Sequence, residues 1–315
     1  MSRKVDLIIH ADWGSNPKKR WMCVAKRVRL SYEVNAPEPV GELETFWERI
    51  TALAGGGSVV VGFDFPIGLP RSYAHNAGVS SFVDALGRFG EGEWKQFYEL
   101  SEQQSQISLQ RPFYPFRPGG TMLPHLIEGL ALSDGLELLR RCERKTKNRG
   151  PASPLFWTLG SKQVGRAAII GWRDIIAPGL ADESLQLKIW PFHGSIKDLV
   201  GSDTVVVAET YPAEACLHLG LSPPGRKWAK TSQHGRQGQS DKIFSWAQRR
   251  RINFTENLAA MILDGFGTGK GADDSFDAVL GALSMLEVTL GFRAEGNPSD
   301  NSVSKIEGWI LGQEA

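Results

Sequence analysis

The sequence has few cysteines, almost no net charge and no long apolar run. Its three cysteines are odd in number and far apart, so we expect a reducing compartment and no disulfide framework. The net charge of +1 provides no overall attraction to nucleic acid or to a membrane surface. No apolar stretch is as long as a membrane span, and the first residues lack the apolar core of a signal peptide. We therefore expect a cytoplasmic protein without membrane contacts.

The first part of the chain has the pattern of a mixed sheet with one helix. Residues 5–10, 21–28 and 30–34 are short apolar strands, joined closely enough to form an antiparallel meander. The period then changes to that of an amphipathic helix over residues 39–54, and a buried strand follows at residues 59–65. We predict an α/β fold with a mixed central sheet, this three-strand meander plus further strands, flanked by helices.

The rest of the chain is less regular. We expect residues 71–191 to form a largely helical insertion in a single domain that spans residues 1–315. A strand is predicted over residues 204–209, and the tract 234–240 is polar enough to be mobile. Residues 305–311 can add an edge strand or cover the core. The predicted helices are 82–89, 94–100, 123–142, 163–176, 212–217, 241–263 as one or two helices, and 272–290.

Carboxylates stand at the ends of three predicted strands. Asp12 follows the first strand, and Glu209 ends the strand at residues 204–209. Asp64 comes at the end of a run of β-branched and aromatic residues, just before Pro66, which cannot continue the strand as a ladder donor. Taken alone, Asp64 is equally well a turn residue, since Asp before Pro commonly opens a turn. The repetition of the pattern favours a functional role.

The last predicted helix also begins with acidic residues. The helix dipole favours acids in a first turn, and capping explains Asp273 and Asp274 adequately. Asp277 lies one turn further in, on the same helical side, and the small residues Gly281 and Ser284 continue that side. An acid on the side that approaches a sheet is unusual unless a cation meets it.

Carboxylates from four distant segments are therefore expected to meet. Gathered in a low-dielectric cleft, they repel one another by on the order of several kcal/mol, and a hard divalent cation, Mg²⁺ or Mn²⁺, would neutralise them. Two such ions about 4 Å apart would activate a water and stabilise the leaving oxygen of a phosphodiester. No His or Cys cluster competes for a softer metal, and the lone His10 is more typical of a satisfied core residue.

Three segments are candidates for contacts with nucleic acid. The basic segment at residues 140–149 begins with Arg140 and ends with Arg149, and a second one runs from Arg226 to Lys230. Residues 111–120 interleave aromatic side chains with arginine and proline, a pattern that can stack on bases. The structural alternatives are a solvated helix end for a charge run and a packed surface loop for the aromatic segment.

The order of these elements and acids resembles the ribonuclease H-like fold. The pattern Asp274-Ser275-Phe276-Asp277-Ala278 on the last helix looks like that of RuvC-type nucleases. Three further stretches resemble the signatures of domain-of-unknown-function family 429, which is regarded as a family of predicted ribonuclease H-like nucleases. They are Gly-Phe-Asp-Phe-Pro-Ile-Gly-Leu-Pro at residues 62–70, Glu-Thr-Tyr-Pro-Ala at residues 209–213 and Glu-Gly-Trp-Ile at residues 307–310. The resemblance spans the chain in order and covers the insertion least.

The resemblance implies a divalent-metal-dependent phosphodiester hydrolase, a predicted nuclease. It implies that Asp12, Asp64 and Asp277 are the core ligands of Mg²⁺ or Mn²⁺ and that Asp274 is a fourth ligand or helper. Glu209 would be an accessory catalytic acid beyond the direct ligands.

Two other classes of function remain open. The turn Asp-Trp-Gly-Ser at residues 12–15 fits an actin-like nucleotide-binding phosphotransferase or ATPase, but such proteins need two copies of the core and the sequence contains one. The glycine-rich residues 265–271 are not a phosphate loop, because Asp264 replaces its first glycine and Gly271 its Ser or Thr. The third class is a binding module that has kept the fold and lost the chemistry.

Overall fold

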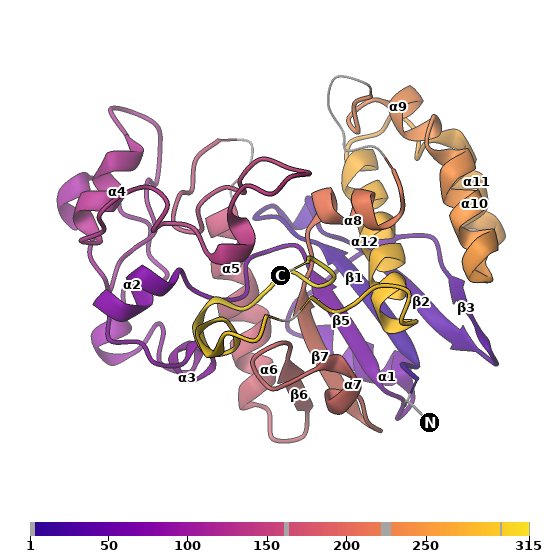
Figure 1. Ribbon diagram of the computed structural model, residues 1–315, viewed down its shortest axis with the longest axis horizontal. Coiled ribbons are helices and arrows are strands. Elements are labelled where there is room, and N and C mark those ends of the chain that lie inside the picture. The colour runs from indigo at the N-terminus through magenta and orange to yellow at the C-terminus, as the bar shows by residue number, and fades with distance from the viewer. Residues whose placement is uncertain (1–3, 161–163, 222–227, 297, 315) are drawn as a thin grey trace.

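The computed structural model describes residues 4–160, 164–221, 228–296 and 298–314. The described chain forms a mixed α/β structure around one eight-stranded sheet, with helices on both faces (Figure 1). The strand order is β6-β7-β5-β1-β2-β3-β8, and β4 pairs with β2. The strands are β1 (Leu7–Asp12), β2 (Trp21–Val28), β3 (Ser31–Val34), β4 (Glu38–Pro39), β5 (Val59–Phe63), β6 (Gln186–Ile189), β7 (Thr204–Glu209) and β8 (Ile252–Phe254).

The helices are mostly short. They are α1 (Phe46–Ala54), α2 (Arg71–Asn76), α3 (Phe82–Leu86), α4 (Leu123–Gly129), α5 (Val164–Gly171), α6 (Ala177–Ala181), α7 (Ile196–Leu199), α8 (Pro212–His218), α9 (Gln233–Gln237), α10 (Ser240–Arg250), α11 (Glu256–Asp264) and α12 (Ala272–Thr289). Turns of 3₁₀ helix lie at Pro17–Lys19, Gly92–Trp94, Gln104–Gln106 and Arg141–Glu143, and π-helical turns at Trp172–Ile176 and Val303–Glu307. Within the described residues, no helix combines the length and the apolar character needed to cross a membrane.

The predicted antiparallel meander is confirmed, since β2 pairs antiparallel with both β1 and β3. The next strands, β5, β7 and β6, join the other side of β1 in parallel. Parallel strands end at the same edge of a sheet, so the ends of β1, β5 and β7 lie together. This edge is where the sequence places Asp12, Asp64 and Glu209.

Alternate residues of the central strands face two different cores. Ile8, Val60 and Val206 point toward the face that α12 covers, together with α8, α10 and α11. Their neighbours in each strand point to the other face, where α1, α5 and the segments between β5 and β6 pack. Figure 1 shows α2 to α5 on the left of the sheet, α9 to α11 at the upper right, and α12 lying across the sheet near β1 and β2. Each strand is therefore buried on both sides, which explains its continuous apolar run.

A close approach between α12 and β1 depends on Gly281. A Cβ atom at this position would lie 2.2 Å from ring atoms of His10, so a larger residue would push the helix away. The His10 ring is fully buried and satisfied: Nδ1–H donates to the carbonyl of Ala278 (3.2 Å), and Nε2 accepts from the Thr210 hydroxyl (2.8 Å). His10 is therefore a core residue, as its isolation in the sequence indicates.

Several predicted helices are shorter than their hydrophobic pattern. The helix predicted over residues 39–54 begins only at Phe46, because Glu38–Pro39 pairs with β2 as β4. The prediction over residues 94–100 is wrong: this segment forms turns, and its aromatic residues stack with Phe89. The prediction over residues 123–142 holds only for α4, and a 3₁₀ turn at Arg141–Glu143 ends the segment.

The second half of the chain differs from prediction at three places. The expected insertion at residues 71–191 contains β6, which pairs with β7 at the edge of the sheet. Residues 241–263 form two helices, one of the two predicted alternatives, but the strand β8 between them, which follows a left-handed residue at Arg251, was not predicted. The polar tract at residues 234–240 is helical, and Arg236 within it is buried because it donates to backbone carbonyls.

Candidate carboxylate site

A cleft of about 960 Å³ lies at the edge of the sheet where β1 and β5 end. Asp12 lines it from the last position of β1, and Asp64 lines it from the position directly after β5. Asp274 and Asp277 line it from the start of α12, and Lys230 lies in the same cleft. The structure therefore brings together four of the five acidic residues that the sequence predicts to form a site.

The strand register explains why two of these acids face the same side. Ala11 pairs with Phe63, so Asp12 and Asp64 occupy equivalent positions one residue further along β1 and β5. Side chains alternate between the faces of a sheet, and these two share the direction of the residues that face α12. Asp277 belongs to that helix and is buried beside them.

The loop after β1 connects the two strand ends. The backbone N–H of Trp13 donates to Asp64 Oδ1 at 2.6 Å. Arg20 shapes this loop by donating to the carbonyls of Gly14 (2.8 Å) and Ser15 (3.2 Å), and its guanidinium lies 5.0 Å from the centre of the Trp13 ring. One oxygen of the Asp64 carboxylate is therefore held by backbone that Arg20 orients.

Burial and mutual repulsion raise the pKa values of the acids. Burial raises the pKa of Asp64 to about 7, although the Trp13 N–H lowers it, and the charge of Asp277 adds to the rise. Burial, followed by the charges of Asp64 and Asp277, raises the pKa of Asp12 well above its ordinary range. Burial also raises the pKa of Asp277. The cluster therefore retains protons near neutral pH unless a cation compensates its charge.

Lys230 is a cation that lies directly on these carboxylates. Its Nζ forms an ion pair with Asp277 Oδ2. Burial lowers the pKa of Lys230, but the charges of Asp277, Asp12 and Asp64 outweigh burial and raise it. The ammonium group is therefore charged at neutral pH and lowers the pKa of Asp277 in return.

The donor set has the chemistry of a hard-metal site. Carboxylate oxygens are preferred ligands of Mg²⁺ and Mn²⁺, and Asp274 Oδ2 is a buried oxygen without a hydrogen-bond partner. The geometry is not that of a finished metal site, because no three His, Cys, Asp or Glu side chains of the described chain are already placed to hold an ion. Lys230 holds Oδ2 of Asp277, so a metal ion that used this oxygen would have to displace the ammonium.

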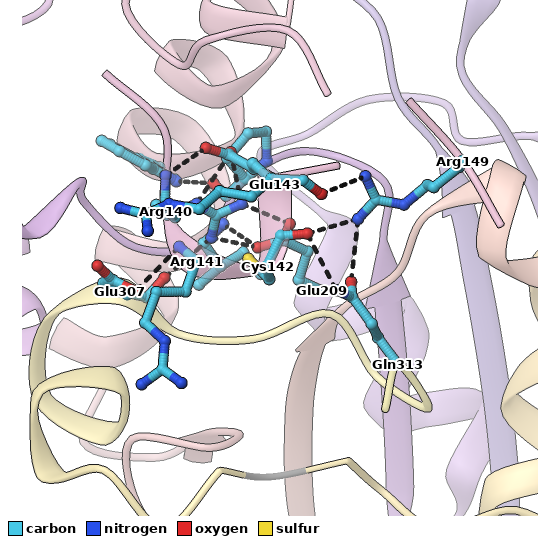
Figure 2. A network of polar contacts seen from close by, with 12 residues as sticks. Arg140, Arg141, Cys142, Glu143, Arg149, Glu209, Glu307 and Gln313 are labelled. Carbon is cyan, nitrogen blue, oxygen red and sulfur yellow. Dashed lines mark hydrogen bonds and ion pairs between the residues drawn. The ribbon is translucent and has the colours of Figure 1, made fainter. Parts of the chain in front are cut away.

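Glu209, the fifth predicted residue, lies elsewhere. It pairs with Phe63, one residue before Asp64, so its side chain points to the opposite face of the sheet. There both carboxylate oxygens bind Arg140, at 2.6 Å and 2.7 Å, and the backbone N–H of Ile67 donates to Oε2 at 2.6 Å (Figure 2). The structure does not bring Glu209 into the cleft with the four aspartates.

Arg140 is fully buried at the centre of a polar network (Figure 2). Besides Glu209, its guanidinium donates to Glu143 Oε1 (2.9 Å) and to the carbonyl of Glu307 (3.0 Å). The backbone N–H of Arg140 donates to the other Glu143 oxygen (2.9 Å), and the N–H of Arg141 donates to the Glu307 carboxylate (3.0 Å). Each of the two carboxylates on the guanidinium thus has both oxygens hydrogen-bonded.

The network joins segments that are far apart in sequence. Leu69 N–H donates to the carbonyl of Ile306 (2.8 Å), and Leu311 N–H donates to that of Glu209 (2.8 Å). Gly68 has a positive φ of 139°, and a Cβ atom there would lie 2.1 Å from the carbonyl oxygen of Glu307. Residues 67–69, Glu209 and Glu307 therefore meet around one buried arginine, whereas Asp64, three residues before residue 67, lines the cleft.

Most arginines of the segment at residues 140–149 bind within the protein. Arg141 pairs with Asp300 (2.8 Å), and Arg149 pairs with Glu214 (2.7 Å) and lies over the Tyr211 ring at 5.1 Å. In the aromatic segment at residues 111–120, Phe113 and Tyr114 are buried and Phe116 is exposed. Of the other basic segment, residues 226 and 227 lie outside the described chain.

Two residues of the predicted basic segments have partners within the protein that the sequence did not indicate. Arg140 and Lys230 belong to basic segments predicted to contact phosphates, whereas the structure pairs both with carboxylates of the protein itself. A charge run indicates basic character without indicating which members point inward. The spacing of Arg140 and Glu143, one helical turn apart, was the available signal of an internal pair.

The chain matches no protein-family model, no curated protein and no solved structure. The interpretation of the site therefore depends on its own geometry and chemistry.

Proposed function

We propose that the protein is a divalent-metal-dependent phosphodiester hydrolase. The observation that carries the proposal is the convergence of three carboxylates on one cleft: the buried Asp12 and Asp277, from β1 and α12, and the half-buried Asp64, directly after β5. Their raised pKa values show that each charge is unfavourable there without a cation. Such perturbed groups in a cleft are typical of functional sites.

The ribonuclease H-like fold and the resemblance to domain-of-unknown-function family 429 are part of this proposal. The antiparallel meander β1-β2-β3, the parallel strands β5 and β7 beside β1, and an aspartate on a late helix that packs on β1 support it. The same arrangement supports the proposed ligand roles of Asp12, Asp64 and Asp277. Asp274, with its unpartnered oxygen, is the candidate for a fourth ligand.

The residues of the cleft suggest a division of labour. Asp12, Asp64 and Asp277 would hold the metal, and bound Mg²⁺ or Mn²⁺ would supply an activated water and stabilisation of the leaving oxygen. The Trp13 N–H holds one oxygen of Asp64 in place, so the other oxygen has a defined direction. Lys230, once it leaves Asp277, carries a positive charge in the same cleft and can bind a phosphate oxygen.

A calorimetric titration with Mn²⁺ tests the proposal directly. We expect the native chain to bind Mn²⁺ and Asp64→Asn to weaken binding by about tenfold or more, because the variant loses a charged ligand. Asp273→Asn is the control. It makes the same change of Asp to Asn in the first turn of α12, at an acid that does not line the cleft. Hydrolysis of a chromogenic phosphodiester should require Mn²⁺ and disappear in Asp64→Asn. Native Mn²⁺ binding and cleavage in Asp64→Asn would contradict the proposal.

A second candidate is a module of the same fold that binds its ligand without cleaving it. The Lys230–Asp277 ion pair favours this candidate, because an internal ammonium already compensates part of the carboxylate charge. A protein of this kind would bind no Mn²⁺ in the titration and would be inert toward the chromogenic diester. Uptake of Mn²⁺ with displacement of Lys230 would exclude it.

A further inference from the structure

The cleft has the size and enclosure of a small-ligand site. On one side α8 and α12 line it, through Ala213, Phe276 and Leu280 among others. On the other side lie residues 148–153 and α5, so the aspartates lie between two walls. Its volume of about 960 Å³ falls at the upper end of the range of about 300–1,000 Å³ for pockets that bind small molecules and cofactors.

Aromatic side chains line the cleft beside the carboxylates. Tyr211 lies at the start of α8, and Trp228 packs with its ring centre 6.2 Å from that of Phe276 in an edge-to-face arrangement. The Arg149 guanidinium covers the Tyr211 ring. Stacking of a base on an aromatic side chain contributes about 1–3 kcal/mol, so these residues can recognise a planar ring attached to the reacting phosphate.

Among the described lining residues, Lys19 is the one exposed cation that a long polyanion could contact. Tight binding of a polynucleotide needs several Lys or Arg side chains that contact phosphates away from the reacting one. Lys230 is paired with Asp277, and Arg149 is paired with Glu214 and almost buried, with 6% of its side chain exposed. Arg140 is fully buried as well. Acidic groups outnumber cations among the described lining residues of the cleft.

We infer that the cleft selects a small phosphodiester that carries an aromatic base. Such a ligand is a dinucleotide, or a mononucleotide whose phosphate is esterified a second time, and a polynucleotide is a poor ligand. This inference rests on the proposed function for the reacting group and names its substrate class. Tyr211 and Trp228 contact the base, and the four aspartates lie at the phosphate.

The inference is tested by comparing substrates of different length. In Mn²⁺, we expect the kcat/KM per phosphodiester bond of a dinucleotide to equal or exceed that of a 20-residue single strand of the same bases. The logarithm of the dinucleotide affinity should fall with log salt with a slope of about −1 or shallower, because one phosphate is contacted. Cleavage of the long strand about tenfold faster per bond, with a steep salt slope, would overturn the inference and leave the hydrolase intact.

Two variants locate the base. Trp228→Leu and Tyr211→Leu should each raise KM for the dinucleotide by about fivefold to tenfold, with a smaller change in kcat, because stacking is lost and the carboxylates remain. Phe116→Ala is the matched control, since it removes an exposed aromatic residue that does not line the cleft. Thermal unfolding verifies that the compared variants fold. A loss caused by Phe116→Ala and not by the cleft variants would indicate a polymer on the outer surface.

Binding separates this inference from the hydrolase proposal. Calorimetry with a dinucleotide and Mn²⁺ reports binding even if no bond is broken. Binding that Trp228→Leu or Tyr211→Leu weakens, without cleavage of any substrate, would support the ligand class and contradict the hydrolase. Absence of dinucleotide binding to the native chain would overturn the inference, whatever the chain cleaves.

Discussion

Two charged clusters at the edge where the parallel strands end differ in how their charges are satisfied. At the network of Arg140, Glu143 and Glu209, each carboxylate oxygen accepts at least one hydrogen bond and no side chain lines the cleft. At the carboxylate site, Asp274 has an unpartnered oxygen, and the pKa of Asp64 rises to about 7. In the network, burial also raises the pKa of Glu143, but the charge of Arg140 opposes this rise. Complete internal satisfaction characterises a structural cluster, whereas an unmet need for cations characterises a binding site.

The comparison also explains the difference between two residues that the sequence treats alike. Asp64 and Glu209 each end a strand and precede a proline within two or three residues. A one-residue difference in register places them on opposite faces of the sheet. One face offers a guanidinium that binds both oxygens of Glu209, and the other offers further acids to Asp64.

The largest change in stability is expected from removing Arg140, the cation at the centre of its network with Glu143 and Glu209. Arg140→Met leaves two buried carboxylates without their cation, so we expect the free energy of unfolding to fall by about 3–5 kcal/mol in urea denaturation. Arg141→Met is the control, because its partly exposed ion pair with Asp300 should contribute about 1 kcal/mol or less. Equal losses in the two variants would show that the network does not stabilise the fold.

Glu209→Gln asks whether that residue is structural or catalytic. The amide keeps the shape of the side chain and an acceptor for the Ile67 N–H, but it loses the charged bonds to Arg140, so stability should fall by about 2–3 kcal/mol. Mn²⁺ affinity should stay within about twofold of the native value, in contrast to Asp64→Asn. Loss of Mn²⁺ binding at unchanged stability would instead assign Glu209 to the carboxylate site.

The strands that build the site could be predicted from sequence because their chemistry is local. The β-branched runs before Asp64 and Glu209 form β5 and β7, and the position of Asp277 one turn into a helix follows from helical spacing. Which strand ends share a face depends on register, and register depends on pairings between residues far apart in the chain.

The partners of the basic residues could not be predicted for a related reason. Arg140 lies within a charge run, and only the folded chain places it against Glu209, which is 69 residues away. Lys230 similarly meets Asp277 across 47 residues. For both residues, a long-range ion pair determines what the local pattern leaves open. The helix predicted over residues 123–142 ends at Gly129, and the backbone turns left-handed at Ala131.

A smaller change in stability, here an increase, is expected from removing the charge of Asp64 at the carboxylate site. The pKa of Asp64 is about 7 in the folded protein and 3.8 in its ordinary state, so the folded state binds this proton more tightly. Its contribution to stability is therefore complete below pH 4 and is lost as pH rises toward and through 7. Asp64→Asn cannot ionise, so the variant should be more stable than the native chain by on the order of 2 kcal/mol at pH 8.

Denaturation of both chains at pH 5, 6, 7 and 8 measures this difference. The stability advantage of Asp64→Asn should grow with pH, while Asp273→Asn, which changes an acid that does not line the cleft, should show no such trend. Saturating Mn²⁺ should reduce the advantage, because the ion stabilises the ionised native cluster and not the variant. If the stability advantage of Asp64→Asn were independent of pH, ionisation of Asp64 would not destabilise the native fold.

The smallest change in stability, and the sharpest test of the comparison, is expected for Lys230→Met. The Lys230 side chain is 37% exposed and Asp277 can take up a proton when its partner is removed, so the loss should be about 1 kcal/mol. Without the ammonium, Asp277 is open to a metal ion, so Mn²⁺ should raise the melting temperature more in Lys230→Met than in the native chain. Cleavage should nevertheless fall, because the Lys230 ammonium, the proposed partner of the phosphate, is absent.

Lys19→Met removes a cation of the cleft that acts on Asp274 and does not pair with Asp277, so it should change the Mn²⁺ response less than Lys230→Met does. If Lys230→Met instead weakened Mn²⁺ binding, Lys230 would be a fixed partner of the acids, as Arg140 is of Glu143 and Glu209. The carboxylate site and the Arg140 network would then not differ in how their charges are satisfied.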